Sequence, residues 1–67
     1  MELDAKYPEI TVQLTGIDGN AGTIMGAVSA ALRRHGHASE VDEFRRQALS
    51  GSYDELLQTC MRWVNCT

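Results

Sequence analysis

The sequence predicts an α+β domain in which one main β-strand is followed by three packed α-helices. Three observations lead to this fold class. Apolar and polar side chains alternate between Glu9 and Thr15, three later segments carry apolar side chains at helical spacing, and turn residues separate these segments. A chain of 67 residues fits a single small globular domain, residues 1–67, near the lower limit for folding unaided.

The strand is expected over Glu9 to Thr15, with the side chains of Ile10, Val12 and Leu14 facing the core. A single strand leaves backbone N–H and C=O groups unpaired along its edges, so it needs a partner. The C-terminal tail, residues 63–67, is the candidate within the chain. Pairing with the same strand of a second copy would make a homodimer instead. Both arrangements fit the sequence, so we expect a monomer or a homodimer.

A glycine-rich turn, residues 16–22, precedes the first helix. Either Asp18 or Asn20 can cap that helix by accepting hydrogen bonds from its first free N–H groups. Gly36 is expected to end it in the left-handed conformation. The predicted apolar face of this helix consists of Ile24, Met25, Val28, Ala31 and Leu32.

Two further helices are predicted from capping signals. Ser39 is expected to start the second helix, with Asp42 three residues later in a near capping box, and residues 50–51 to end it. Ser52 is expected to start the third, with Glu55 completing a fuller capping box. The predicted apolar faces are Val41, Phe44, Ala48 and Leu49 in the second helix, and Tyr53, Leu56, Leu57, Cys60, Met61, Trp63 and Val64 in the third.

Composition restricts the class of protein. Six basic and nine acidic residues give a formal net charge of −3, which disfavours phosphate backbones and anionic membrane surfaces as partners. A hydrophobic content of 43% indicates a folded core, and two cysteines are too few for a disulfide framework. No signal-peptide pattern and no apolar run of about 18 residues is visible. We expect a soluble cytoplasmic protein with reduced thiols and with no membrane or direct nucleic-acid partner.

Several residue types that carry chemistry occur without the spacing that the chemistry needs. The glycine turn lacks the lysine of a phosphate loop and does not match the dinucleotide-binding fingerprint. No nucleophile is paired with a base by any recognisable pattern, so we expect no enzymatic activity and no cofactor. The potential metal ligands have spacings unlike those of structural zinc sites, so we expect no metal. These residues are His35, His37, Cys60 and Cys66.

Gly22, Gly26 and Ala30 recur every four residues and give the first helix a face with almost no side chains. Each glycine inside a helix costs roughly 1 kcal/mol relative to alanine. The strand or the third helix could pack tightly against this small-residue stripe and offset that cost, which is the interpretation that we favour. The alternative is a docking groove for a partner.

Acidic residues gather at the starts of the second and third helices. Carboxylates there complement the helix dipole, which accounts for them without any partner. They also offer an acidic surface that could occupy a basic, nucleic-acid-binding surface on another protein. The candidate partner-binding residues are Glu40, Asp42, Glu43, Asp54 and Glu55.

A helix-turn-helix is the alternative interpretation, because a short glycine-bearing turn, residues 50–52, joins the second and third helices. Asp54 and Glu55 would then open the recognition helix, where they would face phosphates. DNA binding would depend on a patch of basic residues. The patch would consist of Arg33, Arg34, Arg45, Arg46 and Arg62.

Two segments, LTGIDGNAGTIMGAV at residues 14–28 and SGSYDELLQTCMRWVN at residues 50–65, resemble a family of short uncharacterised proteins of bacterial and phage genomes. The family brings no assigned activity and therefore no catalytic residues. The resemblance implies an origin in a mobile element. Small acidic phage proteins are often inhibitors of host defence, including anti-CRISPR proteins, so the resemblance also favours a binding role.

The predicted function is non-enzymatic protein binding, as a phage or mobile-element inhibitor of host defence. Its partner would be a host protein whose basic, nucleic-acid-binding surface is blocked by the acidic face. The alternative function is that of a small helix-turn-helix-like DNA-binding regulator that uses the arginine patch.

Overall fold

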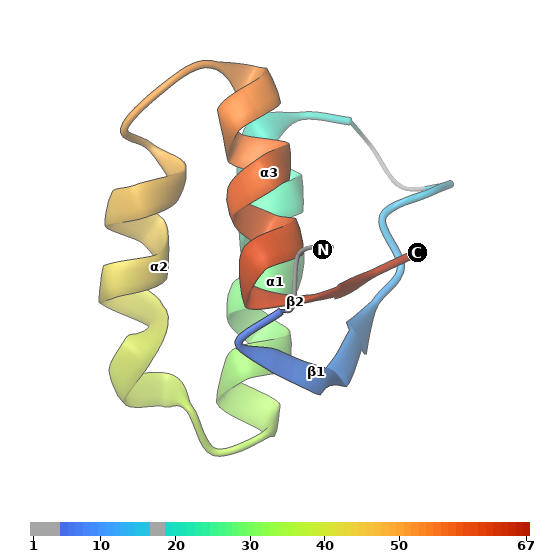
Figure 1. Ribbon diagram of the computed structural model, residues 1–67, viewed down its shortest axis with the longest axis vertical. Coiled ribbons are helices and arrows are strands. Elements are labelled where there is room, and N and C mark those ends of the chain that lie inside the picture. Colours follow the sequence, from blue (N-terminus) through green and yellow to red (C-terminus); the bar gives the residue numbers. More distant parts are fainter. Residues whose placement is uncertain (1–4, 17–18) are drawn as a thin grey trace.

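The computed structural model describes residues 5–16 and 19–67, and the α+β class predicted from the sequence is confirmed. Figure 1 shows the helices packed beside the short strands. In chain order the elements are strand β1 (Tyr7–Val12), helix α1 (Ala21–Arg34), the 3₁₀ turn η1 (Ala38–Glu40), helix α2 (Val41–Ala48), helix α3 (Tyr53–Trp63) and strand β2 (Val64–Cys66).

The C-terminal tail, one of the two partners that the sequence leaves open, pairs with the first strand. β1 and β2 are parallel, and Tyr7 lies opposite Val64. The pairing continues past the strand ends, since the Thr67 N–H donates to the Val12 carbonyl over 3.0 Å and the Leu14 N–H donates to the Thr67 carbonyl over 2.8 Å. Parallel strands need a long crossover, and here all three helices lie within it. The blue and red strands in Figure 1 therefore hold distant parts of the sequence together.

The bounds of the first strand differ from the prediction of Glu9 to Thr15. β1 begins at Tyr7 and ends at Val12. It ends there because β2 is only three residues long and stops at Cys66, opposite Val12. Ile10 and Val12 are buried as predicted, whereas Leu14, which follows the strand, is half-buried.

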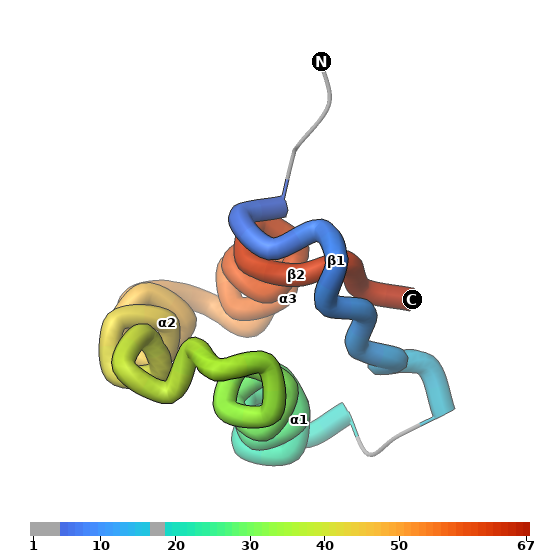
Figure 2. Tube along the Cα trace, turned by 90° about the horizontal axis from the view of Figure 1, so that it is seen from below, coloured from blue at the N-terminus to red at the C-terminus, as the bar shows by residue number. Residues whose placement is uncertain are grey.

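The core lies between the three helices and the strand pair. Figure 2 shows the helices grouped in a triangle, with the strands beside α3. Phe44 is fully buried and meets Trp63 edge-on, with 5.6 Å between ring centroids. Such aromatic pairs add roughly 0.5–1.5 kcal/mol to the burial of their area. The other buried apolar residues are Ile10, Val12, Ile24, Val28, Ala31, Leu32, Val41, Ala48, Leu56, Cys60 and Val64.

The capping predictions hold for two helices. Asn20 caps α1, because its Oδ1 accepts a hydrogen bond from the first turn over 2.8 Å. Asp18, the other predicted cap, lies outside the described residues. Gly36 has a φ of +84°, which is the left-handed conformation expected after α1. Ser52 and Glu55 form the predicted capping box of α3.

The predicted start of the second helix is wrong. Ser39 lies inside η1, and α2 begins only at Val41. Glu40 occupies the N-cap position of α2 without a side-chain capping bond. Its carboxylate instead contacts Lys6 and Tyr7, so a long-range contact takes the place of the local capping box.

Three side chains assigned to apolar faces are exposed. The exposed fractions are 63% for Leu49, 46% for Tyr53 and 44% for Met61. Leu49 follows the last residue of α2, and the Tyr53 hydroxyl donates to the Gly19 carbonyl over 2.6 Å. Met61 faces away from the core because the buried face of α3 is narrower than predicted. That face consists of Leu56, Thr59, Cys60 and Trp63.

Candidate protein-binding surfaces

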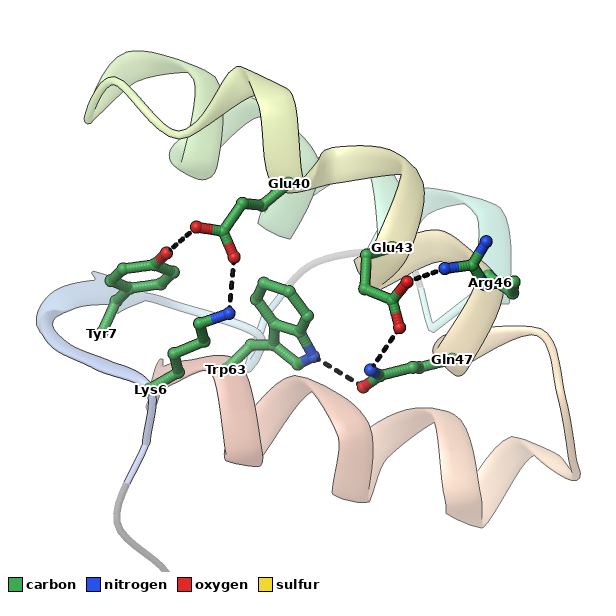
Figure 3. A network of polar contacts seen from close by, with 7 residues as sticks. All are labelled: Lys6, Tyr7, Glu40, Glu43, Arg46, Gln47 and Trp63. Atoms are coloured by element: carbon green, nitrogen blue, oxygen red, sulfur yellow. Dashed lines mark hydrogen bonds and ion pairs between the residues drawn. The ribbon is translucent and has the colours of Figure 1, made fainter.

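Glu40 holds the N-terminal segment against η1. Its Oε1 accepts a hydrogen bond from Lys6 Nζ over 2.6 Å, and its Oε2 accepts one from the Tyr7 hydroxyl (Figure 3). The Tyr7 ring stacks on His37 with 3.9 Å between centroids. Lys6 Nζ lies 4.7 Å from the centroid of the Trp63 ring, within cation–π range. These five side chains, which we call the Glu40 network, join β1, η1 and α3.

Hydrogen bonds within the Glu40 network shift the pKa values of Glu40, Lys6 and Tyr7. The pKa of Glu40 lies below its ordinary value, first because of the hydrogen bond from Lys6 and then because of that from Tyr7. The pKa values of Lys6 and Tyr7 are raised, mainly by their hydrogen bonds to Glu40. A carboxyl group whose pKa is lowered on folding stabilises the fold above its unfolded pKa, and this contribution is lost as the pH falls through the folded pKa.

The acid sensitivity of Glu40 leads to a testable prediction. We expect Glu40→Gln to be less stable than the native chain at neutral pH and equally stable well below about pH 4, the ordinary range of a glutamate pKa. Urea unfolding followed by circular dichroism at both pH values measures this. Asp42→Asn is the matched control, because Asp42 is exposed and its side chain forms no hydrogen bond or ion pair with a described residue. A Glu40→Gln variant that loses as much stability in acid as the native chain would contradict the role of this carboxylate.

Glu43 is engaged within α2. It forms an ion pair with Arg46 one turn later, and its Oε2 accepts a hydrogen bond from Gln47 Nε2 over 2.8 Å. The other end of the Gln47 amide accepts from Trp63 Nε1 over 3.0 Å, which links α2 to α3 (Figure 3). An exposed ion pair of this kind adds about 0–1 kcal/mol to stability. It does place opposite charges side by side, so Glu43 and Arg46 offset each other on the surface.

The five predicted acidic residues do not form one face. Glu55 Oε1 accepts from the Ser52 N–H over 2.8 Å and so completes the helix cap. Asp42 and Asp54 are exposed and form no ion pair or side-chain hydrogen bond with the described residues. α2 and α3 run side by side in opposite directions, so their N-termini lie at opposite ends of the helix pair (Figure 1). Asp42 and Asp54 are therefore separate carboxylates rather than parts of one patch.

Two of the predicted basic residues come together between α1 and α2. Arg33 and Arg45 line an open groove of about 230 Å³, which we call the α1–α2 groove. Neither forms an ion pair with any residue in the described ranges. Arg46 is paired with Glu43, and neither Arg34 nor Arg62 lines the groove. The remaining lining residues are Gly22, Met25, Gly26 and Ser29.

The small-residue stripe of α1 lies on the surface, so its predicted tight packing is wrong. Gly22, Gly26 and Ala30 are all exposed. A methyl group added to Gly26 would meet no heavy atom within 4 Å. The core takes a different face of α1, with Ile24 and Val28 among its buried side chains, so neither β1 nor α3 covers the stripe.

An apolar pocket of about 150 Å³ adjoins the groove at the N-terminal end of α1. The exposed Leu49 and Tyr53 line it, together with Ala21. Met25 lines both the pocket and the groove, so the two hollows lie next to each other on α1. The pocket carries the exposed apolar side chains, and the groove carries Arg33 and Arg45.

The sequence predicts the parts of this surface but not that they lie together. It places Leu49 and Tyr53 in the core, and Arg33 and Arg45 in a larger basic patch. The signal available in the sequence was the small-residue stripe, which runs toward Arg33 on the same helix.

The cysteines and histidines are not gathered into a metal site in the part of the chain that the structure describes, where no group of three or more His, Cys, Asp or Glu is placed to hold an ion. Cys60 is buried and Cys66 is half-buried, and both are free thiols. Burial raises the pKa of Cys60 to about 12 and raises that of Cys66. Both thiols are therefore protonated and weakly nucleophilic at neutral pH.

Comparisons with protein-family models, with curated proteins and with solved structures each give no match. Among the described residues, no helix has both the length and the apolar character that crossing a bilayer requires.

Proposed function

We propose that this chain is a non-enzymatic protein-binding domain, and that its binding surface consists of the α1–α2 groove and the adjoining apolar pocket. The main support is the exposure of Leu49 (63%) and Tyr53 (46%) at the edge of an open pocket. Apolar side chains gathered around a concavity mark interaction sites more often than scattered ones do. Full burial of one leucine side chain contributes about 1.5–3 kcal/mol, so a partner that covers Leu49 gains appreciable affinity.

A protein partner fits this surface better than DNA does. The chain has a net charge of −3, which repels a phosphate backbone. A DNA-reading helix-turn-helix crosses its helices at about 90–120°, whereas α2 and α3 lie side by side and antiparallel (Figure 1). Asp54 and Glu55 occupy the first turn of α3, where a recognition helix would contact DNA.

Capture of partners from a bacterial lysate tests the proposal. We expect the immobilised native chain to retain a protein after nuclease treatment, and Leu49→Ser to retain at least about tenfold less, because about 1.4 kcal/mol of lost burial is a tenfold change in affinity. Met61→Ser is the matched control, since Met61 is also exposed (44%) but lines neither the groove nor the pocket. Retention that disappears with nuclease would favour the DNA-binding alternative. Equal retention by the two variants would contradict the assigned surface.

A separate experiment tests the finer prediction that the chain is a phage-type inhibitor. In that form of the proposal, acidic residues block a nucleic-acid-binding surface of a host protein. Asp42 and Asp54 are the two predicted acids whose side chains form no hydrogen bond or ion pair with a described residue, so charge reversal there breaks no such contact. We propose that charge reversal at both positions would abolish inhibition of a defence nuclease and leave the circular dichroism spectrum unchanged. Inhibition that survives the reversal would exclude the acidic form of the proposal.

A further inference from the structure

We propose that the α1–α2 groove receives an amphipathic α-helix of the partner protein, with carboxylates in the first turn of that helix and a large apolar side chain two turns later. This inference rests on the proposed protein-binding function and specifies the chemistry of the partner. The carboxylates would lie between Arg33 and Arg45, and the apolar side chain would enter the pocket beside Leu49 and Tyr53.

The floor of the groove suits a helix. Helices pack by placing a ridge of side chains into a groove of the neighbouring helix, and one common set of ridges follows every fourth residue. On α1 the residues Gly22, Gly26 and Ala30 have this spacing and are exposed, and the two glycines line the groove. Because these positions lack large side chains, a second helix can approach the α1 backbone closely. Recognition of an amphipathic helix in such a groove is a recurring mode of peptide binding.

The positive charge of the groove favours a ligand with negatively charged groups. Arg33 and Arg45 come from different helices and face the same open space without an ion-pair partner among the described residues. Two guanidinium groups that form no ion pair with the described residues make a local positive site on a chain of net charge −3. Guanidinium groups bind carboxylates through paired, charge-assisted hydrogen bonds. An acidic ligand is thus selected at this end of the groove.

The spacing and direction of the ligand follow from α1. Met25, where pocket and groove meet, and Arg33 are eight residues apart, which is about 12 Å or two turns along a helix. An antiparallel ligand would bring its N-terminal turn to Arg33 and its apolar residue to the pocket. The ligand's own helix dipole favours carboxylates in its first turn. The antiparallel direction therefore places the carboxylates at the arginines and also at the end of the ligand helix where they are most stable.

A synthetic helical peptide tests this inference. The probe is an alanine-rich peptide about four turns long with two glutamates in its first turn and a leucine two turns later. In a titration of the ¹⁵N-labelled native chain, we expect the amide signals of Gly22, Gly26 and Ser29 to shift most. Replacing the probe's glutamates by glutamine should weaken binding at least about tenfold, because the charge-assisted hydrogen bonds to the guanidinium groups are lost. Replacing its leucine by alanine should weaken binding by a similar factor, because apolar burial in the pocket is lost.

Matched variants of the protein sharpen the titration. Arg33→Gln should weaken binding of the acidic probe at least about fivefold, whereas Arg34→Gln, one residue away and outside the groove, should not. Equal effects of the two substitutions, or no shifts at groove residues at millimolar probe, would overturn the inference. Tighter binding of a single-stranded oligonucleotide at the same amides, or concentration-dependent self-association that fills the groove, would also overturn it.

The two proposals can fail separately. Loss of lysate capture in Leu49→Ser together with unchanged capture in Arg33→Gln would leave protein binding in place and reject the acidic helix as the ligand. If neither substitution changes capture, the assignment of the groove and pocket as the binding surface is rejected.

Discussion

Phe44→Ala is expected to lower the free energy of unfolding by about 3–5 kcal/mol, the usual effect of removing a buried aromatic side chain. Phe44 is fully buried and lies edge-on to Trp63, so alanine would leave a cavity between α2 and α3. A domain of 67 residues is stabilised by only about 0.05–0.15 kcal/mol per residue. The total is then about 3–10 kcal/mol, so the substitution should remove a large part of the stability and measurably raise the unfolded fraction.

Urea unfolding followed by far-ultraviolet circular dichroism measures this effect. Leu49→Ala is the control, because Leu49 lies near the end of the same helix and is 63% exposed. We expect its effect to be within about 0.5 kcal/mol. A Phe44→Ala variant as stable as Leu49→Ala would contradict the described core.

Val64→Asp is expected to destabilise the fold by about 4 kcal/mol or more. Val64 is fully buried in β2, where it lies opposite Tyr7. The substitution loses about 1.5–3 kcal/mol of apolar burial and adds an unpaired buried charge, which costs at least a further few kcal/mol. The parallel strand pair should then separate, and the rest of the fold with it.

Asn65→Asp provides the matched control for the strand pair. It places an aspartate one residue further along β2. Asn65 is exposed there, and its Nδ2 donates a hydrogen bond to Thr11 Oγ1 over 3.3 Å. We expect its loss of stability to be about 1 kcal/mol or less, the typical size of one hydrogen bond. Similar thermal unfolding midpoints for the two variants would mean that β2 does not bury Val64 as described.

Local signals predicted the local structure well. The alternation around Ile10 and Val12, the capping box of Ser52 and the glycine stop at Gly36 each depend on residues close together in the sequence. The start of α2 could not be predicted in the same way. There Glu40 contacts side chains more than thirty positions earlier, and that contact replaces the local cap suggested by Ser39.

The candidate site depends on which helix face the fold leaves uncovered, and the sequence does not contain that information in local form. A stripe such as Gly22, Gly26 and Ala30 serves equally for close packing and for exposure, and only the tertiary arrangement decides. The acidic residues illustrate the same point. Glu40 and Asp42 are two positions apart, yet one is engaged in a long-range network and the other is exposed.

The central claim is that the fold leaves the α1–α2 groove open and that a partner fills it. The variant Gly26→Leu tests this claim most directly, because its stability and its binding of the probe can both be measured. Leucine is favoured over glycine inside a helix by roughly 0.8 kcal/mol, and a Cβ at Gly26 meets no heavy atom within 4 Å. We expect urea unfolding to show unchanged or higher stability, and the acidic helical probe to bind at least about tenfold more weakly because the new side chain occupies its place. A loss of stability above about 1 kcal/mol, or unchanged binding of the probe, would contradict the claim.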